Sequence, residues 1–89
     1  MRKIILIVTD GCTACKIMRR LICEALRNTV KEIEFEVQNR KQADKVMMIH
    51  HDITDFPATV LIKDDVVKYV IIGTTAAAAI NRYIDVYLK

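Results

Sequence analysis

Two cysteines separated by two residues are the side chains of this sequence best suited to chemistry. Cys12 and Cys15 lie in the segment VTDGCTACKIMRRL, after a short apolar run and before a basic run with helical spacing. Such a pair can be a redox dithiol, half of a metal site, or two small packed residues without chemistry. The elements that surround the pair bear on this choice.

Length and composition indicate one domain, residues 1–89, because single hydrophobic cores usually comprise about 50–200 residues. The chain is 53% hydrophobic, and its three cysteines are an odd number, fewer than the disulfide framework of a small secreted protein uses. The apolar run at residues 4–8 is shorter than the about 7–15 residues of a signal-peptide core. No stretch reaches the roughly 20 apolar residues that cross a bilayer. We therefore expect a cytoplasmic monomer without a membrane partner. In the reducing cytoplasm, a Cys-x-x-Cys pair is more often catalytic or metal-binding than a permanent crosslink.

Charge is distributed unevenly along the chain. Residues 1–31 contain seven basic and two acidic residues, whereas the remainder contains seven basic and nine acidic ones. This bias indicates either a solvated helix face or a surface that prefers acidic partners. We expect no nucleic-acid partner.

Hydrophobic periodicity predicts the first half of the fold. The continuous apolar run KIILIVT (3–9) is typical of a central strand buried on both faces. Residues 13 to about 28 have helical spacing. EIEFEVQ (32–38) alternates strictly and predicts a half-exposed strand. The apolar side of the predicted helix consists of Ala14, Ile17, Met18, Leu21 and Ala25.

The second half predicts a short helix, a hairpin and a final helix. Residues 40–50 form an amphipathic pattern through Ala43, Val46, Met47 and Ile49. ATVLIK (58–63) and VVKYVII (66–72) are strands joined by a tight turn at Asp64–Asp65, and residues 75–88 are helical. The order β-α-β-α-β-β-α predicts an α/β layered domain with a mixed four-stranded sheet, its first two strands parallel through a right-handed crossover.

The dithiol falls where the first strand ends and the first helix begins. Free backbone N–H groups and the positive end of the helix dipole stabilise a thiolate there, which is the reactive form of cysteine. At about 100° per residue, Lys16, Arg19, Cys23 and Arg27 follow Cys12 along one stripe. Cys12 is therefore expected at the exposed helix tip beside cations, and Cys15 nearer the core. This arrangement suits a nucleophile and its resolving thiol.

A metal site has less support from the spacing, and we expect none. A structural zinc site needs four ligands, and the chain contains one Cys-x-x-Cys pair. Cys23 lies eleven residues after Cys12, about 16 Å along a helix axis, too far to complete the site. His50 and His51 are the remaining candidate ligands, although adjacent histidines at a helix end are usually solvated. Cys23 itself is interpreted as a small residue at the surface or core edge.

Three features resemble the thioredoxin/glutaredoxin superfamily over nearly the whole chain. They are CTAC between a strand and a helix, the segment DITDFPATVLIKDDVVKYVIIG, and the closing helix. The resemblance implies a thioredoxin fold in which Cys12 is the nucleophile and Cys15 the resolving cysteine. It further implies that Pro57 is a cis-proline opposite the dithiol, that the backbone of Phe56 pairs with substrate, and that Gly73 lies at the rim. With these three, Gly11, Thr13 and Ala14 complete the expected substrate-binding residues.

The chain departs from both branches of that superfamily. Leu6 stands where thioredoxins have a buried aspartate, Gly11 replaces a tryptophan, and Thr9 replaces the usual glutaredoxin lysine. Gly73-Thr74-Thr75 replaces the glutaredoxin Gly-Gly-acidic segment, which argues against bound glutathione.

The sequence therefore predicts a thiol–disulfide oxidoreductase that acts on disulfide-containing proteins. Its electrons would come from a reductase or another thiol, with no cofactor beyond a Cys12–Cys15 disulfide and with Lys16 and Arg19 stabilising the thiolate. The alternatives are a binding module with an idle dithiol, and a dimer that holds a metal or an iron–sulfur cluster.

Overall fold

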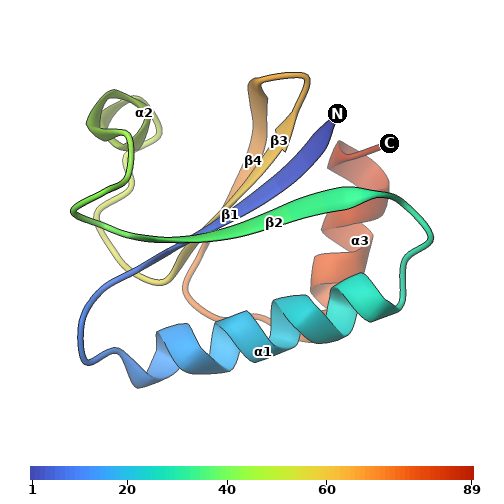
Figure 1. Cartoon of the computed structure of the whole chain (residues 1–89), viewed down its shortest axis with the longest axis horizontal. Helices are drawn as coiled ribbons and strands as arrows, with labels where there is room; N and C mark the ends of the chain where they lie inside the picture. The colour runs from blue at the N-terminus through green and yellow to red at the C-terminus, as the bar shows by residue number, and fades with distance from the viewer.

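A four-stranded sheet in the order β2-β1-β3-β4 organises the chain, which the computed structural model describes from residue 1 to residue 89 (Figure 1). Strand β1 pairs in parallel with β2 and antiparallel with β3, and β3 and β4 form an antiparallel hairpin. The predicted element order and the mixed sheet are confirmed. The elements are β1 (Arg2–Val8), α1 (Thr13–Arg27), β2 (Ile33–Asn39), α2 (Lys45–His50), β3 (Ala58–Lys63), β4 (Val66–Ile72) and α3 (Ala77–Tyr87).

Strand β1 lies inside the sheet and separates two apolar cores. Ile4 and Leu6 face a core formed with α1 and α3, whereas Ile5 and Ile7 face a smaller core on the α2 side. Because neighbouring strand residues point to opposite faces, a continuous apolar run is what a strand covered on both sides requires. Figure 1 shows α1 and α3 on one side of the sheet and α2 on the other. No helix has the length and apolar character needed to cross a membrane.

The β3–β4 hairpin has the turn that its sequence predicts. Asp64 and Asp65 both adopt positive φ angles, 52° and 65°. Two successive residues with positive φ are typical of a type I′ turn, whose twist matches that of the flanking strands. Aspartate tolerates this conformation better than most residues.

The buried face of α1 differs from the predicted one. The buried residues are Cys15, Met18, Ile22 and Ala25, whereas Ile17 is 45% exposed. Ala14 and Leu21 are half-buried. The helix packs against β1 and α3, and this contact turns its buried stripe toward Cys15 and Ile22. A helical wheel alone cannot choose between stripes that lie one residue, or about 100°, apart.

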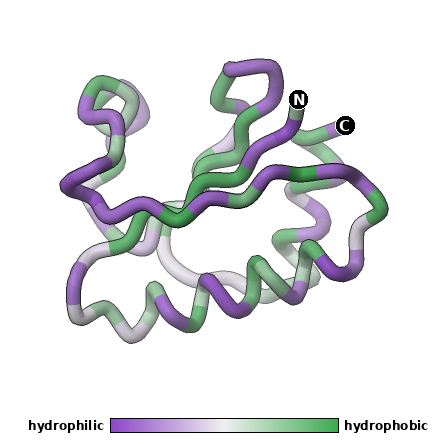
Figure 2. The backbone as a smooth tube through the Cα atoms, viewed as in Figure 1, coloured by the Kyte–Doolittle hydropathy of each residue, from purple (hydrophilic) through white to green (hydrophobic).

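Helix α2 is shorter than the predicted 40–50 helix, and its apolar face is also different. The Asp44 side chain caps it, accepting the N–H groups of Val46 at 2.9 Å and Met47 at 3.2 Å. A side-chain cap of this kind marks the residue at which a helix begins. Val46 and Ile49, predicted to pack, are 77% and 78% exposed. Figure 2 shows that the connection from β2 to α2 is predominantly hydrophilic.

Candidate functional site

The two cysteines form a disulfide at the start of α1. Cys12 is the N-cap residue of this helix, and its Sγ accepts the backbone N–H of Cys15 at 3.0 Å. Gly11 precedes it with φ at +66°, a conformation that strains most other residues and that turns the chain from β1 into the helix. The first sulfur therefore lies among the unpaired N–H groups of a helix end, as the sequence predicts.

Exposure distinguishes the two sulfur-bearing residues. Cys15 is only 4% exposed, whereas Cys12 is half-buried. Cys12 is therefore the more exposed of the two, as expected, although it is half-buried rather than exposed. Thr13 is exposed and Ala14 half-buried between them.

A hollow of about 250 Å³ opens at the dithiol. Lys16 and Arg19 line it and are exposed, and neither forms an ion pair within the protein. Both cations predicted from the helical stripe thus line the same hollow as Cys12. The lining residues are Val8, Thr9, Asp10, Gly11, Cys12, Cys15, Lys16, Arg19 and Val37.

Asp10 is an acidic residue at this hollow, and the sequence did not predict its contacts. Its Oδ1 accepts the side-chain N–H of Asn39 at 3.0 Å, and its Oδ2 lies 3.8 Å from the Nζ of Lys41. These contacts tie the loop before the dithiol to the end of β2 and the connection that follows. They also partly neutralise the one carboxylate among the lining residues.

The Phe56–Pro57–Gly73 group lies at the same end of the sheet. Ala58 stands opposite Ile7 in the antiparallel β1–β3 pair, so Pro57 precedes β3 where β1 leaves the sheet for the dithiol. The Phe56–Pro57 peptide bond is cis, and the N–H of Gly73 donates to the carbonyl of Pro57 at 2.8 Å. Pro57 is buried and Phe56 and Gly73 are half-buried. These three residues do not line the hollow at the dithiol.

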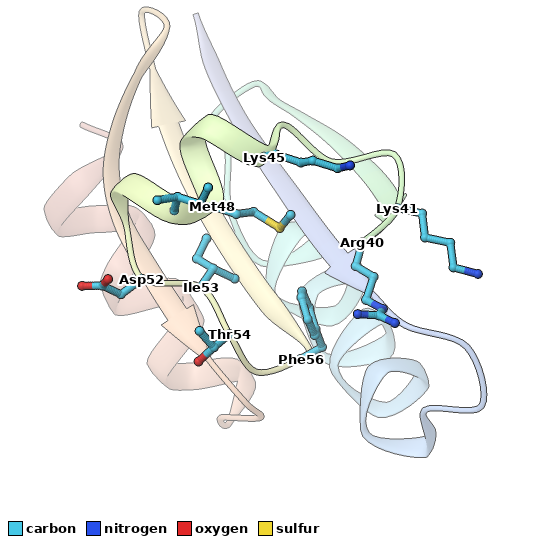
Figure 3. A pocket seen from close by; sticks show the side chains of 9 residues that line it. Arg40, Lys41, Lys45, Met48, Asp52, Ile53, Thr54 and Phe56 are labelled. Carbon is cyan, nitrogen blue, oxygen red and sulfur yellow. The ribbon is translucent and has the colours of Figure 1, made fainter.

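A larger groove of about 690 Å³ lies beside α2, on the opposite face of the sheet from α1 (Figure 3). Phe56 and Arg40 belong to its lining, and Arg40 donates its backbone N–H to the carbonyl of Val8 at 2.7 Å. The sequence analysis did not predict this groove, because its lining residues come from segments separated along the chain. They are Arg40, Lys41, Lys45, Met48, Ile49, Asp52, Ile53, Thr54 and Phe56.

Thr59 is the polar residue of the buried core, and its hydroxyl has no hydrogen-bond partner among the protein atoms. It stands between Leu6 of β1 and Ile71 of β4, both of which belong to the core on the α1 and α3 side. A threonine inside the otherwise apolar segment ATVLI was the available signal. Leu6, at the position of the buried aspartate of thioredoxins, is fully buried in that core.

The other candidate ligands lie outside the dithiol site. His50 and His51 contact each other edge to face at the end of α2, with ring centroids 4.8 Å apart. Cys23 is half-buried and unbonded. No group of three or more histidine, cysteine or acidic side chains is arranged to hold a metal ion.

No protein-family model and no curated protein sequence matches this chain. Two solved structures are similar to it. One is thioredoxin-2, a component of the malaria parasite protein secretion machinery, with a TM-score of 0.78 and 10% identity over 96% of this chain and 82% of that one. The other is described as a malarial protein, with a TM-score of 0.78 and 11% identity over 100% of this chain and 99% of that one. This chain has the thioredoxin fold.

The thioredoxin fold confirms the architecture expected from the sequence resemblance. It brings together a Cys-x-x-Cys disulfide at a helix start, two cations beside it and a cis-proline at the same end of the sheet. Identities of 10% and 11% establish a shared fold, so activity is argued from the residues of the site.

Proposed function

We propose that the protein is a thiol–disulfide oxidoreductase that reduces or exchanges disulfides of protein substrates through Cys12 and Cys15. The observation that carries this proposal is the asymmetry of the pair. Cys12 is half-buried at the N-terminus of α1, while Cys15 is 4% exposed and disulfide-bonded to it. One sulfur is available to a partner, and the other is sheltered yet within bonding reach of the first.

The reaction is a pair of thiol–disulfide exchanges. The Cys12 thiolate attacks one sulfur of a substrate disulfide, which forms a Cys12–substrate disulfide and releases the other substrate sulfur as a thiolate that takes a proton. Cys15, once deprotonated, attacks the Sγ of Cys12, forms the Cys12–Cys15 disulfide and releases the second substrate thiol. Two electrons and two protons leave the dithiol, and the substrate disulfide becomes two thiols.

The surrounding residues stabilise the thiolate and receive the substrate. The helix terminus and the cations of Lys16 and Arg19 favour the ionised form of Cys12. Gly11, Thr13 and Ala14 border the dithiol. On the other side of the site, the backbone of Phe56 pairs with an extended substrate segment. Pro57 and Gly73, which are hydrogen-bonded to each other, border that segment. No cofactor is required, and a cytoplasmic reductase or a small thiol returns the electrons to a monomeric protein.

The test is the reduction potential of the dithiol. The protein is equilibrated with glutathione buffers of graded composition, trapped with an alkylating reagent and analysed by mass spectrometry. A reversible two-electron couple between about −270 and −120 mV, the range of related dithiol proteins, is expected. The Cys23→Ser variant should give the same potential. Absence of a reversible Cys12–Cys15 couple would refute the oxidoreductase.

A binding module with an idle dithiol is the second candidate. The observation that favours it is the groove beside α2, which is larger than the hollow at the dithiol, about 690 Å³ against about 250 Å³. Such a module would retain its partner when both cysteines are replaced with alanine, whereas a partner held through a mixed disulfide would be lost.

A further inference from the structure

The groove beside α2, called the α2 groove below, combines basic walls with an apolar floor. The cations are Arg40, Lys41 and Lys45, and the floor is formed by Met48, Ile53 and Phe56 (Figure 3). We propose that the α2 groove binds an extended segment of the protein substrate in which an acidic and an apolar residue flank the reactive cysteine. This inference rests on the proposed function and specifies the class of substrate.

The cations of the α2 groove are largely without acidic partners. Lys41 is paired with Asp10 at 3.8 Å, and both side chains are highly exposed. Arg40 and Lys45 are exposed and form no ion pair. Asp44, the neighbouring carboxylate, caps α2 through its own hydrogen bonds. An incoming carboxylate therefore meets uncompensated positive charge at this end of the groove.

A negative charge, the carboxylate of Asp52, lies at the opposite end of the α2 groove. The Asp52 carboxylate points away from the three cations in Figure 3. The groove is thus polarised, with an end that attracts acidic side chains and an end that does not. Such polarity selects the orientation of a peptide as well as its charge.

Two contacts connect the lining of the α2 groove with that of the dithiol hollow. Asp10 lines the hollow and contacts Lys41 of the groove, while Arg40 is hydrogen-bonded through its backbone to Val8, which also lines the hollow. Phe56 of the groove precedes Pro57 at the sheet end where the dithiol lies. In the proposed complex, the substrate segment extends at about 3.3 Å per residue from the cysteine at Cys12 into the groove.

The floor of the α2 groove supplies a site for an apolar side chain. Ile53 is only 6% exposed, Met48 and Phe56 are half-buried, and Ile49 at the edge is 78% exposed. Methionine adapts to differently shaped partners, and the exposed isoleucine gains from being covered. Apolar contact would supply affinity, and the cations would supply selection by charge.

The test compares three disulfide-closed peptides that differ in one flanking residue. In each peptide a leucine lies on one side of the reactive cysteine, and the residue on the other side is glutamate, glutamine or lysine. Reduced protein is mixed with each peptide at low salt, and the second-order rate constant of disulfide transfer is measured by acid quench and mass spectrometry. We expect the glutamate peptide to react about 1.5- to fivefold faster than the glutamine peptide, since one exposed ion pair contributes about 0.2–1 kcal/mol. The lysine peptide should be slowest, and high salt should compress the series.

Paired variants locate the effect. In the Arg40→Gln/Lys45→Gln protein, the ratio of the glutamate to the glutamine rate constant should fall close to one. Lys68→Gln/Arg82→Gln removes the same charge from exposed positions on β4 and α3 and should keep the wild-type ratio. Equal rates for all three peptides, or a ratio unchanged by Arg40→Gln/Lys45→Gln, would overturn the proposal while disulfide transfer itself remained intact.

A binding measurement separates this inference from the proposed function. Fluorescent peptides with serine in place of both cysteines are titrated with oxidised protein, and their Kd values are determined from anisotropy. If the glutamate peptide binds more tightly than the others and the Arg40→Gln/Lys45→Gln variant loses this preference, peptide binding in the α2 groove is supported. Should the same protein transfer no disulfide, the proposed oxidoreductase activity would be refuted and the binding site would stand. Equal Kd values for the glutamate and lysine peptides would overturn the α2 groove.

Discussion

The Sγ of Cys12 accepts the backbone N–H of Cys15 at 3.0 Å, so the first sulfur of the dithiol caps the helix that carries the second. In the reduced protein, a thiolate at this cap would be favoured by the helix terminus, with Lys16 and Arg19 in the same hollow. Asp10 opposes this effect, but its carboxylate is held by Asn39 and Lys41.

Alkylation of reduced protein should therefore occur first at Cys12. Cys15 is buried, and Cys23 is half-buried in the middle of α1, where the backbone N–H groups are already bonded. A timed iodoacetamide reaction, analysed by mass spectrometry between about pH 5 and pH 9, measures the order. The Cys23→Ser variant is the control and should give the same rate at Cys12. Earlier modification of Cys23 would contradict an activated Cys12.

Replacement of the buried cysteine should trap substrates. Cys15→Ala removes the resolving thiol but leaves Cys12 able to attack, and alanine suits a position that is 4% exposed. Mixed disulfides that dithiothreitol releases should accumulate when this variant is incubated with oxidised protein substrates. The Cys12→Ala/Cys15→Ala protein is the matched control and should trap none. Adducts that persist in that control, or their absence from Cys15→Ala, would show that the roles are wrongly assigned.

The unpartnered hydroxyl of Thr59 should lower the free energy of unfolding relative to a variant with an apolar side chain of the same shape. A buried hydroxyl without a hydrogen bond has lost its hydration without compensation. Thr59→Val keeps the side-chain shape and should raise the free energy of unfolding by about 1 kcal/mol. Urea denaturation of oxidised protein measures this change, with Thr74→Val at an exposed position as control. A loss of stability would mean that the hydroxyl makes a hydrogen bond in solution.

The orientation of α1 can be tested with two isoleucines five residues apart. Ile22 is fully buried, whereas Ile17 is 45% exposed. Ile22→Ala should lower the free energy of unfolding by about 2–5 kcal/mol, the usual cost of emptying a core site. Ile17→Ala should change it by less than about 1 kcal/mol, because surface substitutions have small effects. A larger loss for Ile17→Ala than for Ile22→Ala in urea denaturation would favour the stripe predicted from the helical wheel.

An ion pair between β1 and β2 should make the free energy of unfolding depend slightly on pH. The Nζ of Lys3 lies 3.1 Å from Glu36, and this ammonium, with the amide of Gln38, holds the pKa of the Glu36 carboxyl below its usual value. A lowered folded-state pKa stabilises the protein above the unfolded-state pKa, and the stabilisation is lost as the pH falls through the folded-state value.

Lys3→Gln should therefore raise the pKa of Glu36 toward its ordinary value, as measured by NMR titration of its side chain. The difference in unfolding free energy between this variant and the wild type should be larger at about pH 7 than at about pH 3. Lys68→Gln on β4 is the control. An unchanged Glu36 titration would show that the pair is not formed in solution.

Local chemistry in the sequence was sufficient to predict the elements and the position of the dithiol. The alternation of residues 32–38 predicts a half-exposed strand, and the apolar run before Cys12 predicts a strand covered on both faces, as observed in β2 and β1. Asp64–Asp65 predicts a tight hairpin turn, because both residues tolerate positive φ angles. These features depend on interactions between residues that are close in the sequence, and so the order of residue types is enough to predict them.

Tertiary packing decided what the linear pattern could not. The wheel placed Ile17 in the core, but contact with α3 and the sheet turned Ile22 inward instead. The α2 groove brings Arg40, from the end of β2, together with Phe56, which lies sixteen residues later. Its shape follows from where α2 docks on the sheet, a choice made by long-range contacts that no local periodicity encodes. The sequence by itself therefore determined the strands, the helices, the placement of a reactive pair and which of its two cysteines is more buried. The tertiary structure alone decided which stripe of α1 is buried and what surface a substrate meets.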